Sequence, residues 1–380
     1  MHSIMNKIQM VDLKSQYQKI KSEIDSSIQS VIDSTSFIKG GIVEEFANNL
    51  ASFLSVKHVI PCGNGTDALQ IAIMSLGLKP SDEIICPSFT FIASAEVIGL
   101  LGFRPVFVDV DYESFNVTAK NIEKAISVKT KAIIPVHLFG QAAPMEEILA
   151  IAKKYDLYVI EDTAQAIGAD YTFSDGTKKK VGTIGTIGCT SFFPSKNLGC
   201  FGDGGAIMTN DDALAEKMKM VANHGMKVRY HHEVLGVNSR LDSIQAAILN
   251  VKLRHLEEYQ KARYEAAQVY TQGLKDIRSI ETPIEVPYSS HVYHQYTLKI
   301  TDGTRDELKA YLQDWNIPAM IYYPIPLHLQ KAFLQIARQG GELETSEKLS
   351  QTVLSLPMHT ELDLDQQKYI IEKIIHFYKS

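Results

Sequence analysis

The sequence predicts an α/β protein in which a large domain, with a mainly parallel seven-stranded sheet flanked by helices, carries a smaller C-terminal α+β domain. Two observations predict this class: short apolar segments alternate with helix-like stretches, and the pattern changes after residue 240. The strand-like segments cover residues 58–62, 83–87, 105–110, 131–136, 157–161, 189–193 and 205–209. The helix-like stretches cover residues 66–76, 94–101, 120–127, 145–155 and 212–223. Because right-handed crossovers bring the strand carboxyl ends to one edge, we expect functional residues there.

The last third of the chain has a different organisation. One long helix is expected over residues 242–273, followed by a segment with Pro283 and Pro287 and a strand-like run at 293–300. A chain of 380 residues exceeds the size of one ordinary core. We therefore predict a large domain at residues 1–250 and a small one at residues 251–380.

Composition excludes several classes of function. The net charge is −6, and the basic residues are scattered, so no basic stripe predicts nucleic-acid binding. The N-terminus lacks the apolar core of a signal peptide, and Ser94 and Glu96 interrupt the apolar stretch 91–103, so we expect a cytoplasmic protein without a membrane segment. The four cysteines show no CxxC spacing, which predicts buried, reduced thiols and no metal site.

Lys196 and Asp162 are the strongest candidates for chemistry. Lys196 lies among Ser191, Ser195 and several glycines, which indicates a backbone that approaches a ligand closely. Asp162 follows the apolar run 157–160 at the end of a predicted strand, which places its carboxylate at the sheet edge. A lysine can hold the aldehyde of pyridoxal phosphate (PLP) as a Schiff base, and a carboxylate can keep the pyridine nitrogen protonated. The alternatives are a surface lysine and an aspartate that caps a helix.

Two further segments predict cofactor contacts. The run Gly-Asn-Gly-Thr-Asp at 63–67 follows a strand and opens a helix, so its N–H groups and the Thr66 hydroxyl could face a phosphate. Thr66 or Asp67 could instead only cap the helix. Phe91 could cover the cofactor ring, and Phe89 is an equal rival for that role.

Together these motifs resemble the DegT/StrS sugar-nucleotide aminotransferases, a branch of the fold-type-I PLP enzymes. The resemblance runs nearly end to end, through residues 63–68, 87–91, 134–137, 161–165, 191–199, 202–205, 236–242 and 323–328. It implies that Lys196 is the Schiff-base lysine, Asp162 the pyridinium partner and Gln165 the neighbour of the ring hydroxyl. The cofactor-binding residues that it implies are Gly65, Thr66, Asp67, Phe91, Asp162, Gln165, Ser191, Lys196 and Asn238.

The resemblance also implies substrates and assembly. The implied substrate-binding residues are Arg240, Tyr322, Tyr323 and His328. Asn238 is implied to reach the phosphate of the other subunit in a homodimer with shared active sites. Within the family, the chain is most similar to enzymes that aminate carbon 3 of UDP-2-acetamido-2-deoxy-3-oxo-glucuronate for surface polysaccharides such as O-antigen, with Tyr322 where those enzymes often have histidine.

The implied reaction has two stages. An amino acid, by resemblance L-glutamate, leaves its amine on the cofactor as pyridoxamine phosphate (PMP), and a nucleotide-linked keto-sugar then receives that amine. Three alternatives stay open: a dTDP-3-keto-6-deoxyhexose, a 4-keto sugar nucleotide, or a non-catalytic PLP-binding regulator.

Overall fold

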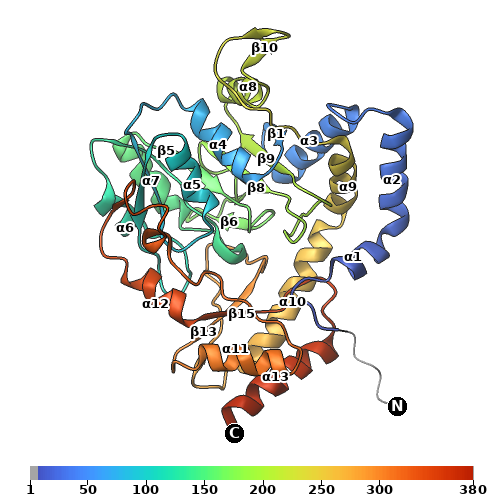
Figure 1. Cartoon of the computed structure of the whole chain (residues 1–380), viewed down its shortest axis with the longest axis vertical. Coiled ribbons are helices and arrows are strands. Elements are labelled where there is room, and N and C mark those ends of the chain that lie inside the picture. Colours follow the sequence, from blue (N-terminus) through green and yellow to red (C-terminus); the bar gives the residue numbers. More distant parts are fainter. Residues whose placement is uncertain (1–6, 380) are drawn as a thin grey trace.

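The computed structural model describes residues 7–379 and has the predicted α/β architecture (Figure 1). All seven predicted strands are present. The strands of the main sheet are β1 (His58–Cys62), β2 (Glu83–Pro87), β3 (Arg104–Val108), β4 (Thr130–Ile133), β5 (Tyr158–Asp162), β8 (Ile187–Ser191), β9 (Gly205–Thr209) and β14 (Arg338–Gln339). The predicted helices are α4 (Gly65–Ser75), α5 (Ala93–Leu100), α6 (Ala119–Ala125), α7 (Met145–Tyr155) and α8 (Asp212–Val221).

The main sheet has eight strands rather than the predicted seven. Its order is β1-β9-β8-β5-β4-β2-β3-β14. Strand β9 pairs antiparallel with both β1 and β8, and the other pairings are parallel. The additional strand, β14, comes from the last fifty residues of the chain, and Arg338 in it donates to Glu83 (Nη2 to Oε2, 2.8 Å). The sequence analysis missed β14 because this strand has no apolar pattern and is held by an ion pair with a distant residue.

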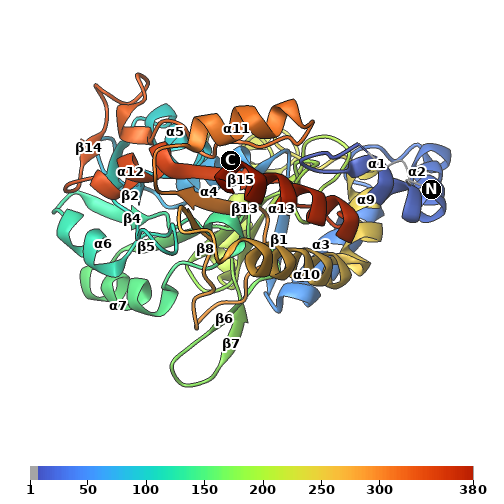
Figure 2. The same ribbon diagram turned by 90° about the horizontal axis from the view of Figure 1, so that it is seen from below.

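Helices cover both faces of the sheet. Apolar residues of α6 and α7 form one buried cluster with Ile85, Ile133 and Val159, whereas α4, α5 and α8 contribute to a second cluster with Ile84 and Ile160. Figure 2 shows α6 and α7 on one side of the sheet and α5 on the other. The alternation of side chains along each strand therefore supplies both buried faces, as a parallel sheet requires.

Several helices and short strands lie outside the predicted pattern. The N-terminal helices are α1 (Leu13–Lys19), α2 (Lys21–Ser34) and α3 (Gly41–Leu54). The remaining short elements are the 3₁₀ helices η1 (Leu138–Gly140) and η2 (Leu327–Leu329), and the hairpins β6 (Asp170–Thr172) with β7 (Lys178–Lys180) and β10 (Met226–Val228) with β11 (His231–His232). The β10–β11 hairpin projects from the top of the molecule in Figure 1.

The expected helix over residues 242–273 is divided in two. Helix α9 (Ser243–Arg254) ends at His255, and α10 (Leu256–Leu274) begins after it. Neither glycine nor proline causes this division. The His255 ring lies 3.3 Å from a carboxylate oxygen of Glu23 on α2 (Nε2 to Oε1), a contact between segments far apart in sequence.

The C-terminal elements form a separate layer. A three-stranded antiparallel sheet of β12 (Ile280–Glu281), β13 (Tyr296–Ile300) and β15 (Val353–Leu356) packs with α10, α11 (Arg305–Asp314) and α13 (Leu364–Lys379), and α12 (Glu344–Thr352) precedes β15. Apolar residues of the three strands and of α10, α11 and α13 form one buried cluster. A domain boundary at residue 250 stays a prediction.

Two predictions from composition can be compared with the structure. All four cysteines are buried and free, as expected. Within residues 7–379, no helix combines the length and the apolar character that crossing a membrane requires.

Candidate active site

A cavity of about 650 Å³ lies at the carboxyl ends of β5 and β8, beside the segment 321–324. This is the sheet edge at which the sequence predicts functional residues. The predicted site residues that line the cavity are Gly65, Thr66, Phe91, Asp162, Gln165, Ser191, Lys196, Tyr322 and Tyr323. Segments far apart in the sequence therefore meet in one hollow.

Asp162 is fixed in the wall of this cavity. It is the last residue of β5 and is 6% exposed. Its Oδ2 accepts a hydrogen bond from the Ser94 hydroxyl at 2.7 Å, and its Oδ1 accepts one from the Ala164 N–H at 3.1 Å. Two donors thus hold an acidic side chain in one orientation at the sheet edge.

Lys196 lies in a tight turn after β8 and faces the same cavity. Its N–H donates to the carbonyl of Phe193 at 2.8 Å, and an added Cβ on Gly199 would come within 2.4 Å of the Pro194 carbonyl oxygen. Only glycine therefore permits this turn. Burial lowers the pKa of the Lys196 amine to about 8, against the opposing effect of the Asp162 charge. A substantial fraction of the amine is then unprotonated, and so nucleophilic, near neutral pH.

The start of α4 forms a second wall of the cavity. Asn64 caps this helix by accepting from the Asp67 N–H (Oδ1, 2.8 Å). A Cβ on Gly65 would lie 2.7 Å from Cβ of Ser191, so the backbone of Gly65 packs directly on that serine. The helix N-terminus carries positive partial charge, and the hydroxyls of Thr66 and Ser191 lie in the same wall. This arrangement is suited to a phosphate group.

The two phenylalanines that the sequence left as rivals differ in position. Phe91 is 54% exposed and lines the cavity, whereas Phe89 is fully buried and packs on Phe115 and Tyr323. Phe91 is therefore the ring available to a ligand.

Gln165 and Tyr323 are connected across the cavity. The Gln165 side-chain amide donates to the Tyr323 hydroxyl at 3.0 Å, and its carbonyl oxygen accepts from the Phe139 N–H at 2.8 Å. The two contacts fix the orientation of the amide. Tyr322, next in the chain, is part-buried in the same wall.

Four predicted site residues lie outside this cavity in their own chain. Asp67 accepts a hydrogen bond from Ser239 (Oγ to Oδ2, 2.6 Å), and its N–H is used by the cap. His328 is 6% exposed, with Nδ1 2.6 Å from the Ser88 hydroxyl and Nε2 3.1 Å from Glu347. The structure thus gives both side chains partners within the protein.

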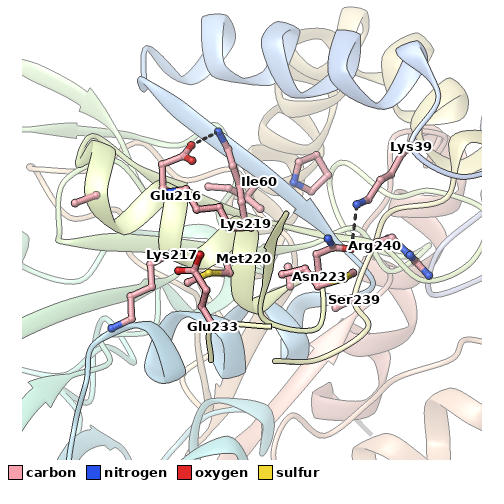
Figure 3. A pocket seen from close by; sticks show the side chains of 15 residues that line it. Lys39, Ile60, Glu216, Lys217, Lys219, Met220, Asn223, Glu233, Ser239 and Arg240 are labelled. Carbon is pink, nitrogen blue, oxygen red and sulfur yellow. Dashed lines mark hydrogen bonds and ion pairs between the residues drawn. The ribbon is translucent and has the colours of Figure 1, made fainter. Parts of the chain in front are cut away.

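Asn238 and Arg240 belong to a neighbouring region. Asn238 pairs with Asn223 as an isolated β-bridge, and Arg240 lines a second hollow of about 620 Å³ between α8 and the β10–β11 hairpin. In Figure 3, Lys39 reaches toward Asn223 beside Arg240, and its Nζ lies 3.0 Å from Oδ1 of Asn223. Asn238 is exposed and Arg240 is part-buried, and neither residue lines the cavity that contains Lys196 of the same chain.

Sequence reasoning missed other residues of the cavity wall. Thr90 and Thr190 line it with buried hydroxyls that have no hydrogen-bond partner among the described residues, and Asp203 and His294 also line it. A lone threonine or histidine carries no pattern that would have identified it. Unpaired buried hydroxyls are unusual, and at a cavity they indicate a polar ligand.

Comparison with known proteins agrees with this geometry. The model of a family described as the DegT/DnrJ/EryC1/StrS aminotransferase family matches residues 18–375. A "Pleiotropic regulatory protein" of Geobacillus stearothermophilus is 48% identical over 98% of this chain and 99% of its own length. The UDP-2-acetamido-2-deoxy-3-oxo-D-glucuronate aminotransferase of Pseudomonas aeruginosa is 46% identical over 96% of this chain and 98% of its own length.

A solved structure also resembles the chain. The crystal structure of ntda from Bacillus subtilis with bound cofactor PMP superposes with a TM-score of 0.91 at 31% identity. The match covers 100% of this chain and 87% of that one.

Proposed function

Because the chain belongs to the DegT/DnrJ/EryC1/StrS aminotransferase family, we propose that it transfers the amino group of L-glutamate to carbon 3 of UDP-2-acetamido-2-deoxy-3-oxo-glucuronate. Aminotransferases of this family use PLP. The observation that carries the proposal is the shared cavity of Lys196 and Asp162, in which a nucleophilic amine and a fixed carboxylate stand at one sheet edge.

The residues of the cavity fit this cofactor. Lys196 would hold its aldehyde and Asp162 its ring nitrogen, while the wall of Gly65, Thr66 and Ser191 would receive its phosphate. Gln165 would lie beside the ring hydroxyl and Phe91 against the ring face. The unpaired hydroxyls of Thr90 and Thr190 support the fit, because they leave polar groups for a ligand to satisfy.

When bound, PLP supplies an aldehyde that takes up the amino group and a ring that accepts electrons from the carbon being deprotonated. The protein's own part is the movement of the proton. Lys196 would take the proton from the α-carbon of glutamate as a free amine and later return one to carbon 3 of the sugar. Asp162 would face the ring nitrogen in an orientation that Ser94 and the Ala164 N–H hold in place.

The sugar assignment is supported by similarity to the enzyme of Pseudomonas aeruginosa. The proposed product would enter the biosynthesis of a surface polysaccharide such as O-antigen, and the proposed place of the reaction is the cytoplasm. Tyr322 and Tyr323 line the cavity, where their phenolic hydroxyls would bind the sugar. Arg240 and His328 are further proposed substrate contacts.

We also propose a homodimer in which each subunit completes the other's site. Among the described residues that line the cavity, Lys196 is the single cation, whereas Asp162 and Asp203 are acidic. A cofactor phosphate and a nucleotide diphosphate together need more positive charge than this wall offers. Asn238 is exposed and Arg240 is part-buried, and neither lines the cavity of its own chain. Both would supply contacts to the partner's site.

A non-catalytic regulator is the second candidate, and the name of the Geobacillus relative favours it. A regulator would not need the strand-end carboxylate and the reactive lysine together. Transfer to a dTDP-3-keto-6-deoxyhexose or to a 4-keto sugar nucleotide is the remaining alternative, because the same catalytic residues serve it.

One assay separates these functions. The protein loaded with PLP is mixed with L-glutamate alone, and formation of PMP is followed by absorbance and of 2-oxoglutarate by mass spectrometry. A panel of UDP- and dTDP-linked keto-sugars is then added. Amination of the UDP-3-oxo uronate is the expected result. Amination of a dTDP sugar instead would assign the alternative substrate, and absence of any reaction with every donor would favour the regulator.

A further inference from the structure

His294 is a cavity residue that the sequence patterns did not identify. It lies on the segment between β12 and β13, and the residue lines the same cavity as Lys196. The residue is 7% exposed. A histidine this buried must use its ring nitrogens in defined ways.

The first ring nitrogen is bound to the neighbour of Lys196 in the chain. The Asn197 side-chain nitrogen donates to the carbonyl oxygen of Val292 at 2.9 Å. Because a carbonyl oxygen can only accept, this contact fixes the orientation of the Asn197 amide. Its oxygen Oδ1 then lies 3.2 Å from Nδ1 of His294. Because an amide oxygen cannot donate, Nδ1 of His294 carries the proton.

The second ring nitrogen must therefore hold a lone pair. Burial lowers the pKa of His294 well below its usual value, and the charges of Lys196 and Arg263 act in the same direction, so the imidazole stays neutral. Nε2 has no hydrogen-bond partner among residues 7–379, and this atom is not fully buried. An acceptor on a ring that lines the cavity is thus left for another group.

The segment that carries His294 is held firmly. Arg263 on α10 is buried, and its Nη1 donates to the carbonyls of Tyr293 at 3.1 Å, of His294 at 3.3 Å and of Met358 at 3.0 Å. The backbone at His294 cannot shift without breaking these contacts, and the ring cannot turn away without losing its contact with Asn197. Its position relative to the Lys196 turn is therefore set in advance.

We propose that His294 is a positioning residue for amino transfer, whose Nε2 accepts a hydrogen bond from the protonated amine of Lys196. This inference rests on the proposed function. Lys196 takes a proton from the α-carbon of the donor and becomes an ammonium group. One N–H of the Lys196 ammonium group then donates to Nε2 of His294. This contact orients a second N–H toward the carbon that receives the proton. His294 gains and loses no proton in the cycle.

Three variants test this role. His294→Asn keeps a donor at the position of Nδ1, and so the contact with Asn197, but has no acceptor at the position of Nε2. His294→Gln and His294→Leu both lose the contact with Asn197, and only glutamine can place an oxygen near the position of Nε2. The other charged groups near the pair, Asp162 and Arg263, are unchanged in all variants.

In the loaded enzyme, we expect His294→Asn to lower kcat about 10- to 100-fold, the effect of one hydrogen bond to a charged group, with KM for glutamate nearly unchanged. His294→Gln should exceed His294→Leu in kcat by about tenfold. A kcat of His294→Asn within about twofold of wild type would overturn the proposal. If that variant does not fold, equal kcat values for the Gln and Leu variants overturn it instead.

A second readout does not depend on turnover. The pH dependence of Lys196 acetylation in the cofactor-free protein is measured by competitive labelling and mass spectrometry. Loss of the acceptor should destabilise the ammonium form, so the midpoint should fall by about one pH unit in His294→Asn. An unchanged midpoint contradicts the role of Nε2. If the midpoint falls in His294→Asn as expected but the wild-type protein reacts with no amino acid, the proposed function is wrong. The hydrogen bond between Lys196 and His294 is then still supported.

Discussion

Ser94 on α5 donates its hydroxyl proton to Oδ2 of Asp162, and the two oxygens lie 2.7 Å apart in the buried wall of the cavity. The contact joins a helix on one face of the sheet to the end of a central strand. It holds the carboxylate in one orientation at the cavity wall.

Replacing Ser94 should therefore weaken catalysis without unfolding the protein. Loss of one such hydrogen bond in Ser94→Ala is expected to lower kcat/KM about 2- to 10-fold. The control is Ser30→Ala, because the Ser30 hydroxyl is in an exposed position and donates to a carbonyl of its own helix. Asp162→Asn gives the upper limit, with turnover abolished and the fold retained. A Ser94→Ala enzyme as active as wild type would contradict the role given to this contact.

The pH dependence of cofactor capture should follow Lys196. Its pKa is lowered to about 8 by burial, so the amine is mostly protonated below pH 8 and mostly free above it. Because only the free amine attacks an aldehyde, the rate at which cofactor-free protein binds PLP covalently should rise with pH and level off above about 8. Stopped-flow absorbance measures this rate. A rise that continues to pH 10 would show an ordinary, solvated lysine.

Gly65 should be intolerant of even a methyl group. A Cβ there would lie 2.7 Å from Cβ of Ser191, and relief of that overlap must displace the start of α4 or β8. We expect Gly65→Ala to weaken PLP binding about tenfold or more, measured by spectroscopic titration. Gly41→Ala is the matched control, because a Cβ at Gly41, also at the start of a helix, meets nothing within 4 Å. Equal affinities in the two variants would refute the close approach.

Sharing of sites between subunits predicts complementation. Lys196→Ala is expected to be inactive alone, and a chain with both Asn238→Ala and Arg240→Ala is expected to be strongly impaired. Co-expression should form heterodimers with one intact site each, so random pairing restores about a quarter of wild-type activity. If Asn238 and Arg240 served the site of their own chain, no heterodimer would contain an intact site, and activity would stay at the level of the impaired parents.

Glu161, next to Asp162, should be important for stability rather than chemistry. Its fully buried carboxylate accepts from the N–H groups of Gly182, Ile184 and Gly185 and lies 2.9 Å from Nε2 of His137. Removing it leaves these donors unpaired, so Glu161→Ala should lower the free energy of unfolding by about 3–5 kcal/mol.

Urea denaturation measures that free energy. The control is Glu372→Ala, in an exposed position of α13, with an expected change of about 0.5 kcal/mol or less. A comparably small change in Glu161→Ala would show that water or rearrangement satisfies the donors.

The sequence predicts where the strands of the main sheet end and which functional residues follow them. Lys196, Asp162 and Gly65 were identifiable because an apolar strand followed by a polar or glycine-rich turn has a fixed place in a parallel sheet. His294 was not, because the run Val-Tyr-His-Gln-Tyr at 292–296 has no periodicity that separates a cavity residue from a core residue. Its position depends on Asn197, almost one hundred residues earlier in the chain.

Other differences also arise from tertiary contacts. Strand β14 is only two polar residues, and its pairing depends on contacts of Arg338 with Glu83 and with the carbonyl of Ala125. His328 belongs to a recognisable motif, but a motif does not say which way a ring points. In the structure, that ring is bound by Ser88 and Glu347.

The late arrival of β14 has a consequence for how the polypeptide matures. On the ribosome, β3 would emerge more than two hundred residues before the segment that covers its open edge, and an uncovered edge strand invites pairing with other chains. A protein shortened to residues 1–250 would keep that edge permanently bare. Such a fragment should precipitate during expression. In the complete chain, β14 in the last fifty residues pairs with β3 and covers this edge.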